Sequence, residues 1–150
     1  MFGIGDGTIE IQTDKTSYKK GDTIKGTLIL NLKKPVKALW LRIDVVGEYY
    51  AHWHEKENEG FETKSQTTRY YWFKNQLDGK KEYPAGKTEY KFSIKIPENL
   101  DEWKTNAYGL LQNLVDKATG GKVPLRWYLQ GRLDKALKFS TVGNLSIELS

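Results

Sequence analysis

The strongest constraint on the fold is an alternation of apolar and polar residues with a period of two, which recurs along most of the chain. This pattern is typical of strands that have one face on a core and the other in water. The clearest example is the run Tyr90, Phe92, Ile94 and Ile96. The same alternation recurs in residues 9–11, 24–32, 39–45, 123–133 and 145–149. The sequence therefore predicts six or seven strands.

Short turns separate these segments. Gly, Pro and Asp residues supply the positive or fixed φ angles of tight turns, and here they lie at 20–22, 33–35, 77–80, 84–86 and 120–121. Many antiparallel strands joined by short turns, without alternating helices, are typical of a β-sandwich or barrel. The predicted fold class is therefore all-β, with an antiparallel sheet architecture.

One segment departs from the period of two. Apolar residues spaced by three and four predict an amphipathic helix at about 100–119, capped by Asn99 or Asp101 and stopped by Gly120. Its apolar stripe is formed by Trp103, Ala107, Leu110, Leu114 and Ala118. We expect the stripe to cover an open end or edge of the sandwich, and a dimer contact is the second interpretation.

Composition bounds the class of protein. With 150 residues, of which 38% are hydrophobic, we expect one domain spanning 1–150. No apolar run is long enough to span a bilayer, and Met1 to Thr13 lacks the pattern of a signal peptide, so we expect a cytoplasmic protein. The absence of cysteine excludes disulfides and thiolate metal sites. Abundant Lys, Glu and Tyr are compatible with a thermophilic source.

The net charge of +5 is not concentrated in one patch. Lysine pairs such as Lys19-Lys20 and Lys80-Lys81 lie next to turn residues, where solvated lysines are common. Specific nucleic-acid binding requires a basic stripe as its minimum footprint. We therefore do not expect nucleic acid as the main partner.

A motif near the start of the chain indicates a family. Tyr18, Gly21, Asp22, Ile24 and Gly26 form the pattern Tyr-x-x-Gly-Asp-x-Ile-x-Gly between two predicted strands. With the later segments 35–48, 71–79, 86–97 and 127–134, the chain resembles the arrestin-like N-terminal domain found in arrestins, the vacuolar-sorting subunit of retromer and sporulation-control proteins. The resemblance implies an immunoglobulin-like antiparallel β-sandwich that binds other proteins and is not an enzyme.

Two features of that family are not carried over. Its members typically pair two sandwiches, whereas we expect one here, so a switch between domains is not expected within this polypeptide. Whether a separate protein supplies a second domain stays open. The phosphate-sensing lysines at the end of the first strand are matched only by Lys15, and their role is not transferred.

Aromatic residues of a predicted hairpin are the candidate binding site. We propose Tyr50, Trp53, Tyr70 and Trp72 as binding residues. Tyr50, Tyr70 and Trp72 are expected to face outward, because Tyr49, Tyr71 and Phe73 share the phase of the inward row Leu39 to Val45. An exposed aromatic patch on a soluble domain usually marks a binding surface.

His52 and His54 are the candidate metal ligands, since alternate residues of a strand point to one side and Glu55 or Glu57 follow. A defined metal site needs three or four converging ligands, so we predict no metal and no cofactor. The chain offers no nucleophile beside a base, and Gly3 to Gly7 is not followed by a helix that could hold phosphate. No enzymatic activity is predicted.

The leading hypothesis is a protein-interaction adaptor that contacts another protein through strand edges and hairpin aromatics. A homo-oligomer through a strand edge or the 100–119 helix is a further expectation. The alternatives are a carbohydrate-binding sandwich, in which the aromatics stack on sugar rings, and a binder of single-stranded nucleic acid that uses the same rings.

Overall fold

The structure is a computed structural model, and it describes residues 7–57, 60–106, 124–135 and 140–150, with the backbone alone described for 53–57 and 61–63. Within these ranges it contains ten strands and one short 3₁₀ helix, η1 (Leu100–Trp103). The strands are β1 (Gly7–Thr13), β2 (Ser17–Tyr18), β3 (Thr23–Leu32), β4 (Val36–Ala38), β5 (Trp40–Glu57), β6 (Gly60–Asp78), β7 (Lys81–Tyr83), β8 (Gly86–Lys95), β9 (Leu125–Asp134) and β10 (Thr141–Leu149).

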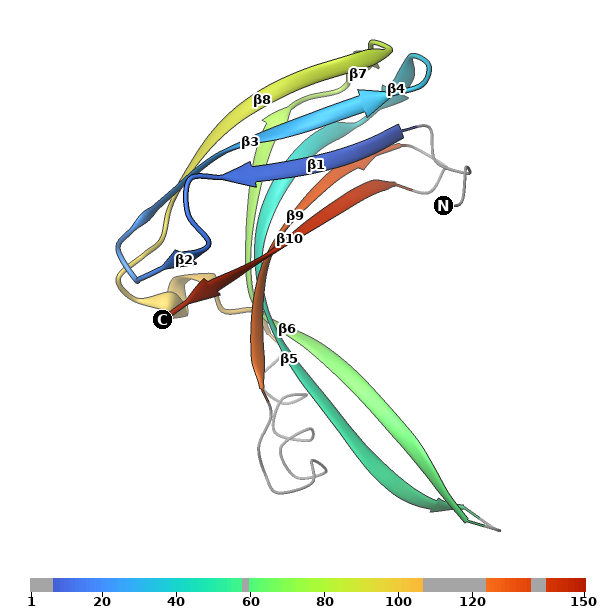
Figure 1. The fold of residues 1–150 in the computed structure, drawn as a ribbon, viewed down its shortest axis with the longest axis vertical. Helices are drawn as coiled ribbons and strands as arrows, with labels where there is room; N and C mark the ends of the chain where they lie inside the picture. The colour runs from blue at the N-terminus through green and yellow to red at the C-terminus, as the bar shows by residue number, and fades with distance from the viewer. Residues whose placement is uncertain (1–6, 58–59, 107–123, 136–139) are drawn as a thin grey trace.

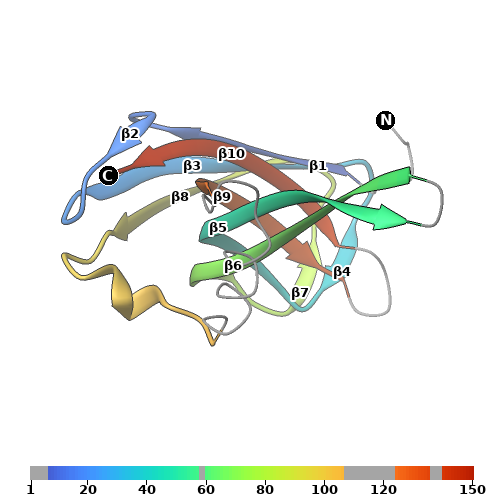
Figure 2. The ribbon, with the colours of Figure 1, turned by 90° about the horizontal axis from the view of Figure 1, so that it is seen from below.

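The strands form two layers closed at one end by a small pair (Figure 1). One layer is a three-stranded sheet in the order β1-β3-β8, and the other is a five-stranded sheet in the order β2-β10-β9-β5-β6. Strands β4 and β7 pair separately. Apart from the parallel β10–β2 contact, the described strands pair antiparallel. Figure 2, seen from below, shows β1, β3 and β8 on one side of β9 and β5.

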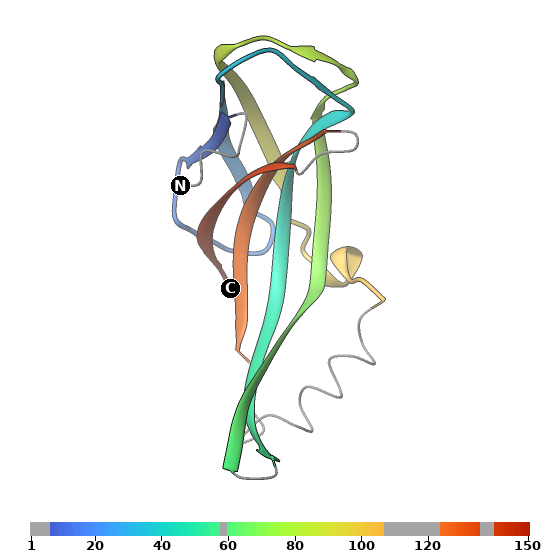
Figure 3. The ribbon, with the colours of Figure 1, turned by 90° about the vertical axis from the view of Figure 1, so that its right-hand side faces the viewer.

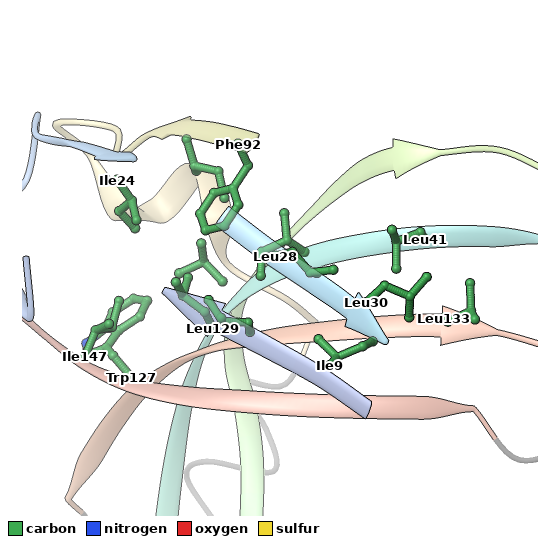
Figure 4. Close-up of a cluster of buried hydrophobic side chains, with 14 of the residues drawn as sticks. Ile9, Ile24, Leu28, Leu30, Leu41, Phe92, Trp127, Leu129, Leu133 and Ile147 are labelled. Carbon is green, nitrogen blue, oxygen red and sulfur yellow. The ribbon is translucent and has the colours of Figure 1, made fainter. Parts of the chain in front are cut away.

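The core lies between the two layers, as the alternation predicts. Ile24, Leu28 and Leu30 of β3 face Leu129 and Leu133 of β9, and all five side chains are at most 1% exposed (Figure 4). Burial of each such aliphatic side chain stabilises the fold by about 1.5–3 kcal/mol. The all-β class predicted from the sequence is confirmed for the described residues.

The Tyr-x-x-Gly-Asp motif builds the β2–β3 turn. Gly21 has φ of 88°, and Asp22 accepts a hydrogen bond from the Lys19 backbone through Oδ2 at 2.9 Å. The Tyr18 side chain is buried, and its hydroxyl donates to Asp14 Oδ1 at 2.7 Å. Gly26 leaves room for Phe92, because a Cβ at this glycine would lie 2.7 Å from the ring. The first glycine of the motif thus supplies a positive φ, and the second leaves space for a neighbouring ring.

The helix expected at about 100–119 is wrong over its first part. Asn99 caps η1 by accepting from the Asp101 backbone, but Lys104 is extended, with ψ of 139°, and ends the helix after one turn. The remainder of the expected helix, 107–119, lies outside the described residues. Trp103 is buried and stacks on Phe73 with ring centroids 5.2 Å apart.

The segment after η1 covers an edge of the five-stranded sheet. The Thr105 backbone N–H donates to the Tyr70 carbonyl at 2.8 Å, and the Thr105 hydroxyl donates to the Arg69 carbonyl at 2.7 Å. A bridge between Tyr71 and Lys104 lies beside these bonds. Residues 104 and 105 therefore cover the β6 edge through their backbone. Of the apolar stripe expected to cover an edge, only Trp103 lies within the described residues, and it stacks on Phe73 of β6.

The two ends of the molecule differ. Strands β5 and β6 continue beyond the sandwich as a paired ribbon, whereas the β4–β7 pair lies at the opposite end (Figure 1).

Across the described ranges, no helix has the length and apolar character needed to cross a membrane.

Candidate functional site

The candidate site is the outer face of the five-stranded sheet. Residues at even positions of β5 and β9 point away from the core, because their odd neighbours, such as Val45 and Leu129, are fully buried against the other layer. Figure 3 shows β10, β9, β5 and β6 side by side in front, with β8 behind them. We call the surface formed by these even positions, with their partners on β6 and β10, the outer face.

A β-bulge on β6 decides which hairpin aromatics reach this face. Gly47 pairs with Tyr71, whereas Glu48 pairs with Arg69, so Tyr70 is an extra residue without a partner on β5. An extra residue reverses the phase of the strand that carries it. On the two sides of the bulge, Trp72 and Arg69 therefore both belong to the outer face.

Tyr70 is only 6% exposed, so its expected outward position is wrong. Its ring packs edge-on against Tyr49 at 5.4 Å and against Tyr71 at 4.8 Å. The prediction assumed an unbroken alternation from Phe73 to Tyr70, and the bulge interrupts it. Burial raises the pKa of Tyr49 and of Tyr71, in agreement with a packed aromatic cluster.

Gly47 provides the space for a second aromatic contact on the inner side of the sheet. Tyr71 and Trp127 stack across this glycine with ring centroids 5.2 Å apart. A Cβ at Gly47 would lie 2.9 Å from both rings. The absence of a side chain at this position therefore lets β6 and β9 bring their rings together over β5.

Trp72 lies on the outer face, half-buried, and is bound to a buried carboxylate. Its indole Nε1 donates to Asp44 Oδ2 at 3.0 Å. Arg42 also binds Asp44 with two hydrogen bonds, from Nε at 3.0 Å and from the terminal guanidinium nitrogen at 2.8 Å. Asp44 is fully buried, and its carboxylate forms an ion pair with Arg42 at 2.8 Å.

Cations lie over the aromatic rings of this face. The Arg69 guanidinium is 4.7 Å from the Trp72 ring centre, and the Lys74 ammonium is 4.5 Å from it. Arg42 lies in the same way 4.0 Å from the ring of Trp40. A ring face that one of these cations covers is not free for stacking by a sugar or a base.

Tyr50 has the same arrangement at the base of the ribbon. The Arg126 guanidinium lies 4.6 Å from its ring centre and 3.8 Å from the Glu48 carboxylate. A shallow hollow of about 270 Å³ lies beside this pair. Its described lining consists of Glu48, Arg126, Trp127, Tyr128, Asn144 and Ser146. Burial raises the pKa of Tyr128 above its ordinary value.

The other candidate residues are placed as follows. Trp53 pairs in register with Lys64, and its side chain is outside the described part. His52 is exposed and its ring lies 5.9 Å from that of Tyr50, whereas the side chain of His54 is also outside the described part. Among the side chains that the structure describes, no group of three or more His, Cys, Asp or Glu residues could hold a metal ion.

Sequence reasoning missed the charged half of the site. Asp44 was not selected, although a carboxylate between Ile43 and Val45 in an apolar strand is unusual enough to indicate a buried partner. Neither Arg69 nor Arg126 was selected as a binding residue. Their positions depend on the bulge and on the pairing of β5 with β9, and neither can be derived from the local sequence.

These features define the class of the molecule as an antiparallel β-sandwich. Residues 7–102 match the family model described as Arrestin (or S-antigen), N-terminal domain. The chain belongs to this family, which confirms the resemblance seen in the sequence.

A solved structure supports the same fold. The crystal structure of Spo0M, a sporulation control protein from Bacillus subtilis, is similar over 98% of this chain with a TM-score of 0.58 and 13% sequence identity. This chain spans about half, 50%, of the Spo0M chain. No curated protein matches the sequence.

Proposed function

We propose that this chain is a non-enzymatic protein-interaction adaptor that binds a partner protein through the outer face. The observation that carries the proposal is the row of arginine-stacked aromatics, Tyr50 with Arg126 and Trp72 with Arg69, on a sheet face. Trp, Tyr and Arg are the residues most enriched in the energetic centres of protein interfaces. Membership of the arrestin N-terminal domain family supports an adaptor role, since the family comprises protein-interaction adaptors.

Preorganisation is the second argument. Arg42 is held by Asp44, and Arg126 lies over Tyr50 beside Glu48, so these side chains lose little rotamer freedom when a partner binds. The ribbon formed by β5 and β6 extends this surface beyond the sandwich (Figure 1). A partner can therefore contact a rigid sheet face and a projecting ribbon together.

The test uses two matched double variants. Tyr50→Ala with Arg126→Ala removes one ring and one cation from the outer face without touching Asp44. Ile29→Ala with Lys91→Ala removes one apolar and one cationic side chain from the solvent side of the β1-β3-β8 sheet. Partners captured from a native lysate by the wild type are identified, purified and titrated against all three proteins.

A purified partner whose dissociation constant rises at least about tenfold for the outer-face variant and less than about twofold for the control supports the proposal. Equal affinity for both variants would contradict it and move the binding surface elsewhere. Recovery of glycans or oligonucleotides alone, with saturable affinity, would instead support one of the two alternative functions.

A further inference from the structure

A separate hollow is lined by residues of the β4–β7 pair and the positions next to it. This pair lies at the end of the sandwich opposite the ribbon (Figure 1). Its volume is about 540 Å³, within the range of about 300–1,000 Å³ that is usual for small-molecule sites. The described residues that line it come from two short segments that pair with each other. They are Lys37, Ala38, Leu39, Lys80, Lys81 and Glu82.

The floor of the hollow is apolar. Leu39 is 39% exposed, and it is one of only two large hydrophobic side chains with such exposure among the described residues. Ala38 lies buried beside it. Lysine side chains have aliphatic stems that cover apolar surface while the ammonium group stays in water. The three lysines that line the hollow can therefore add aliphatic surface to it, while the Lys81 ammonium binds Asp78 at 2.9 Å.

Two of these charges have no partner in the part of the chain that the structure describes. Across the described residues, the ammonium groups of Lys37 and Lys80 make no ion pair, hydrogen bond or ring contact. The cations of the outer face differ, because Arg42, Arg69 and Arg126 each lie over a ring. Cations without internal partners beside an apolar hollow can bind an external anion without breaking an existing contact.

The two carboxylates near the hollow differ in whether a cation of the protein already pairs with them. Asp78 binds the Lys81 ammonium at 2.9 Å and also accepts hydrogen bonds from the Gly79 backbone and the Tyr90 hydroxyl. Its charge is therefore already compensated. Glu82 lines the hollow and lies opposite Lys37 in the β4–β7 register without an ion pair to it. Because Lys81 is paired with Asp78, the remaining charges of the lining are those of Lys37, Lys80 and Glu82, which leave a net charge of +1.

We propose that this hollow binds a single-chain anionic amphiphile, with a carboxylate or phosphate head between Lys37 and Lys80 and its aliphatic chain over Leu39 and Ala38. A free single chain fits better than a membrane surface, because Leu39 is the one exposed large hydrophobic side chain among the described residues that line the hollow. The proposal does not rest on the adaptor function, since the site lies at the other end of the molecule.

The experiment is a titration of ¹⁵N-labelled protein with octanoate, followed by amide chemical shifts. The expected result is a saturable shift confined to residues 37–39 and 80–82. Octyltrimethylammonium has the same chain with the opposite charge, and octanol has no charge. Both are expected to bind at least about tenfold more weakly than octanoate, because the two unpaired lysines favour the anion.

Variants separate this site from general charge effects. Lys37→Glu with Lys80→Glu should weaken octanoate binding at least about tenfold, and Glu82→Gln should strengthen it about twofold. Lys19→Glu with Lys20→Glu makes the same change in net charge at the exposed turn between β2 and β3 and should leave binding unchanged. Leu39→Ser tests the apolar floor and should also weaken binding.

Three outcomes would overturn the proposal. The first is a shift that does not saturate or that spreads over the whole surface. The second is equal binding of octanoate and octyltrimethylammonium. The third is cosedimentation with anionic phospholipid vesicles that depends on Lys37 and Lys80 while octanoate leaves the spectrum unchanged, which would identify a membrane surface as the ligand.

Discussion

The indole of Trp72 donates a hydrogen bond to the carboxylate of Asp44 across the pairing of β5 and β6, at 3.0 Å. Asp44 lies on the solvent side of its sheet and yet is completely buried, because Trp72 and Arg42 both bind it there. A buried carboxylate is tolerated only when its hydrogen bonds are satisfied. The outer face therefore contains a buried charged cluster, which stabilises the fold, and is not simply a solvated surface.

Replacing Asp44 should be costly for this reason. Asp44→Ala leaves the Arg42 guanidinium, with a side chain only 16% exposed, without its partner. We expect the free energy of unfolding to fall by about 3 kcal/mol, measured by urea denaturation. Trp72→Phe removes only one hydrogen bond and some apolar area, so its expected loss is about 1–2 kcal/mol. A loss below about 1 kcal/mol for Asp44→Ala would show that solvent compensates Arg42.

The bulge predicts that two tyrosines of one hairpin contribute differently to the stability of the fold. Tyr70 packs against Tyr49 and Tyr71 and is 6% exposed, whereas Tyr50 is half-buried on the outer face. Tyr70→Ala should lower the free energy of unfolding by about 3 kcal/mol, and Tyr50→Ala by about 1 kcal/mol or less. Chemical denaturation of both variants measures this. The reverse order would mean that the bulge is at another residue in solution.

Gly47 should not accept even one methyl group. Its Cβ would lie 2.9 Å from the rings of Trp127 and Tyr71, which stack over it. Gly47→Ala is therefore expected to destabilise the fold by about 1–3 kcal/mol, measured by thermal unfolding. Gly60→Ala is the matched control, because nothing lies within 4 Å of its Cβ. It should change stability by less than about 0.5 kcal/mol, and an equal effect of both variants would exclude the steric explanation.

Alkaline pH should destabilise the protein through its buried tyrosines. Burial raises the pKa of Tyr83 above its ordinary value of 10.0, and its hydroxyl donates to the Gly79 carbonyl at 2.6 Å. The folded state therefore keeps this proton to a higher pH than the unfolded state. The stability that the protonated Tyr83 hydroxyl adds to the folded state is therefore complete below about pH 10, and it is lost as the pH rises toward the pKa of this group in the folded protein.

The measurement is the free energy of unfolding in urea at about pH 9 and pH 11. Tyr83→Phe cannot ionise at this position, so its stability should fall by about 1 kcal/mol less than that of the wild type over this interval. Parallel pH profiles for the two proteins would show that other groups account for the alkaline loss.

Local patterns predicted most of the fold. Strands such as β3 and β8 have an unbroken alternation, so their burial follows directly from the sequence. The two-residue and three-residue strands β2, β4 and β7 were missed, because they are too short to show a period. The helix beginning at 100 was predicted from apolar spacing, but the pairing of residues 104 and 105 with β6 overrides that preference.

The site was harder to predict than the fold. Tyr50 and Trp72 are on the outer face, but the phase of Tyr70 depends on one unpaired residue, which no periodicity indicates. The burial of Asp44 depends on Trp72, 28 positions away in the sequence. Such contacts are set by the pairing of strands, and the sequence pattern constrains each strand only separately.

The bulge at Tyr70 also allows the length of the ribbon to evolve independently of the core of the sandwich. On its sandwich side, Gly47 and Tyr71 keep the register that the core requires, and on its other side Glu48 and Arg69 begin a new register. Paired insertions or deletions at the ribbon tip, one residue on each strand, would change the reach of the ribbon without moving any core side chain. Descendants of this chain could thus alter what the ribbon touches while inheriting the same body unchanged.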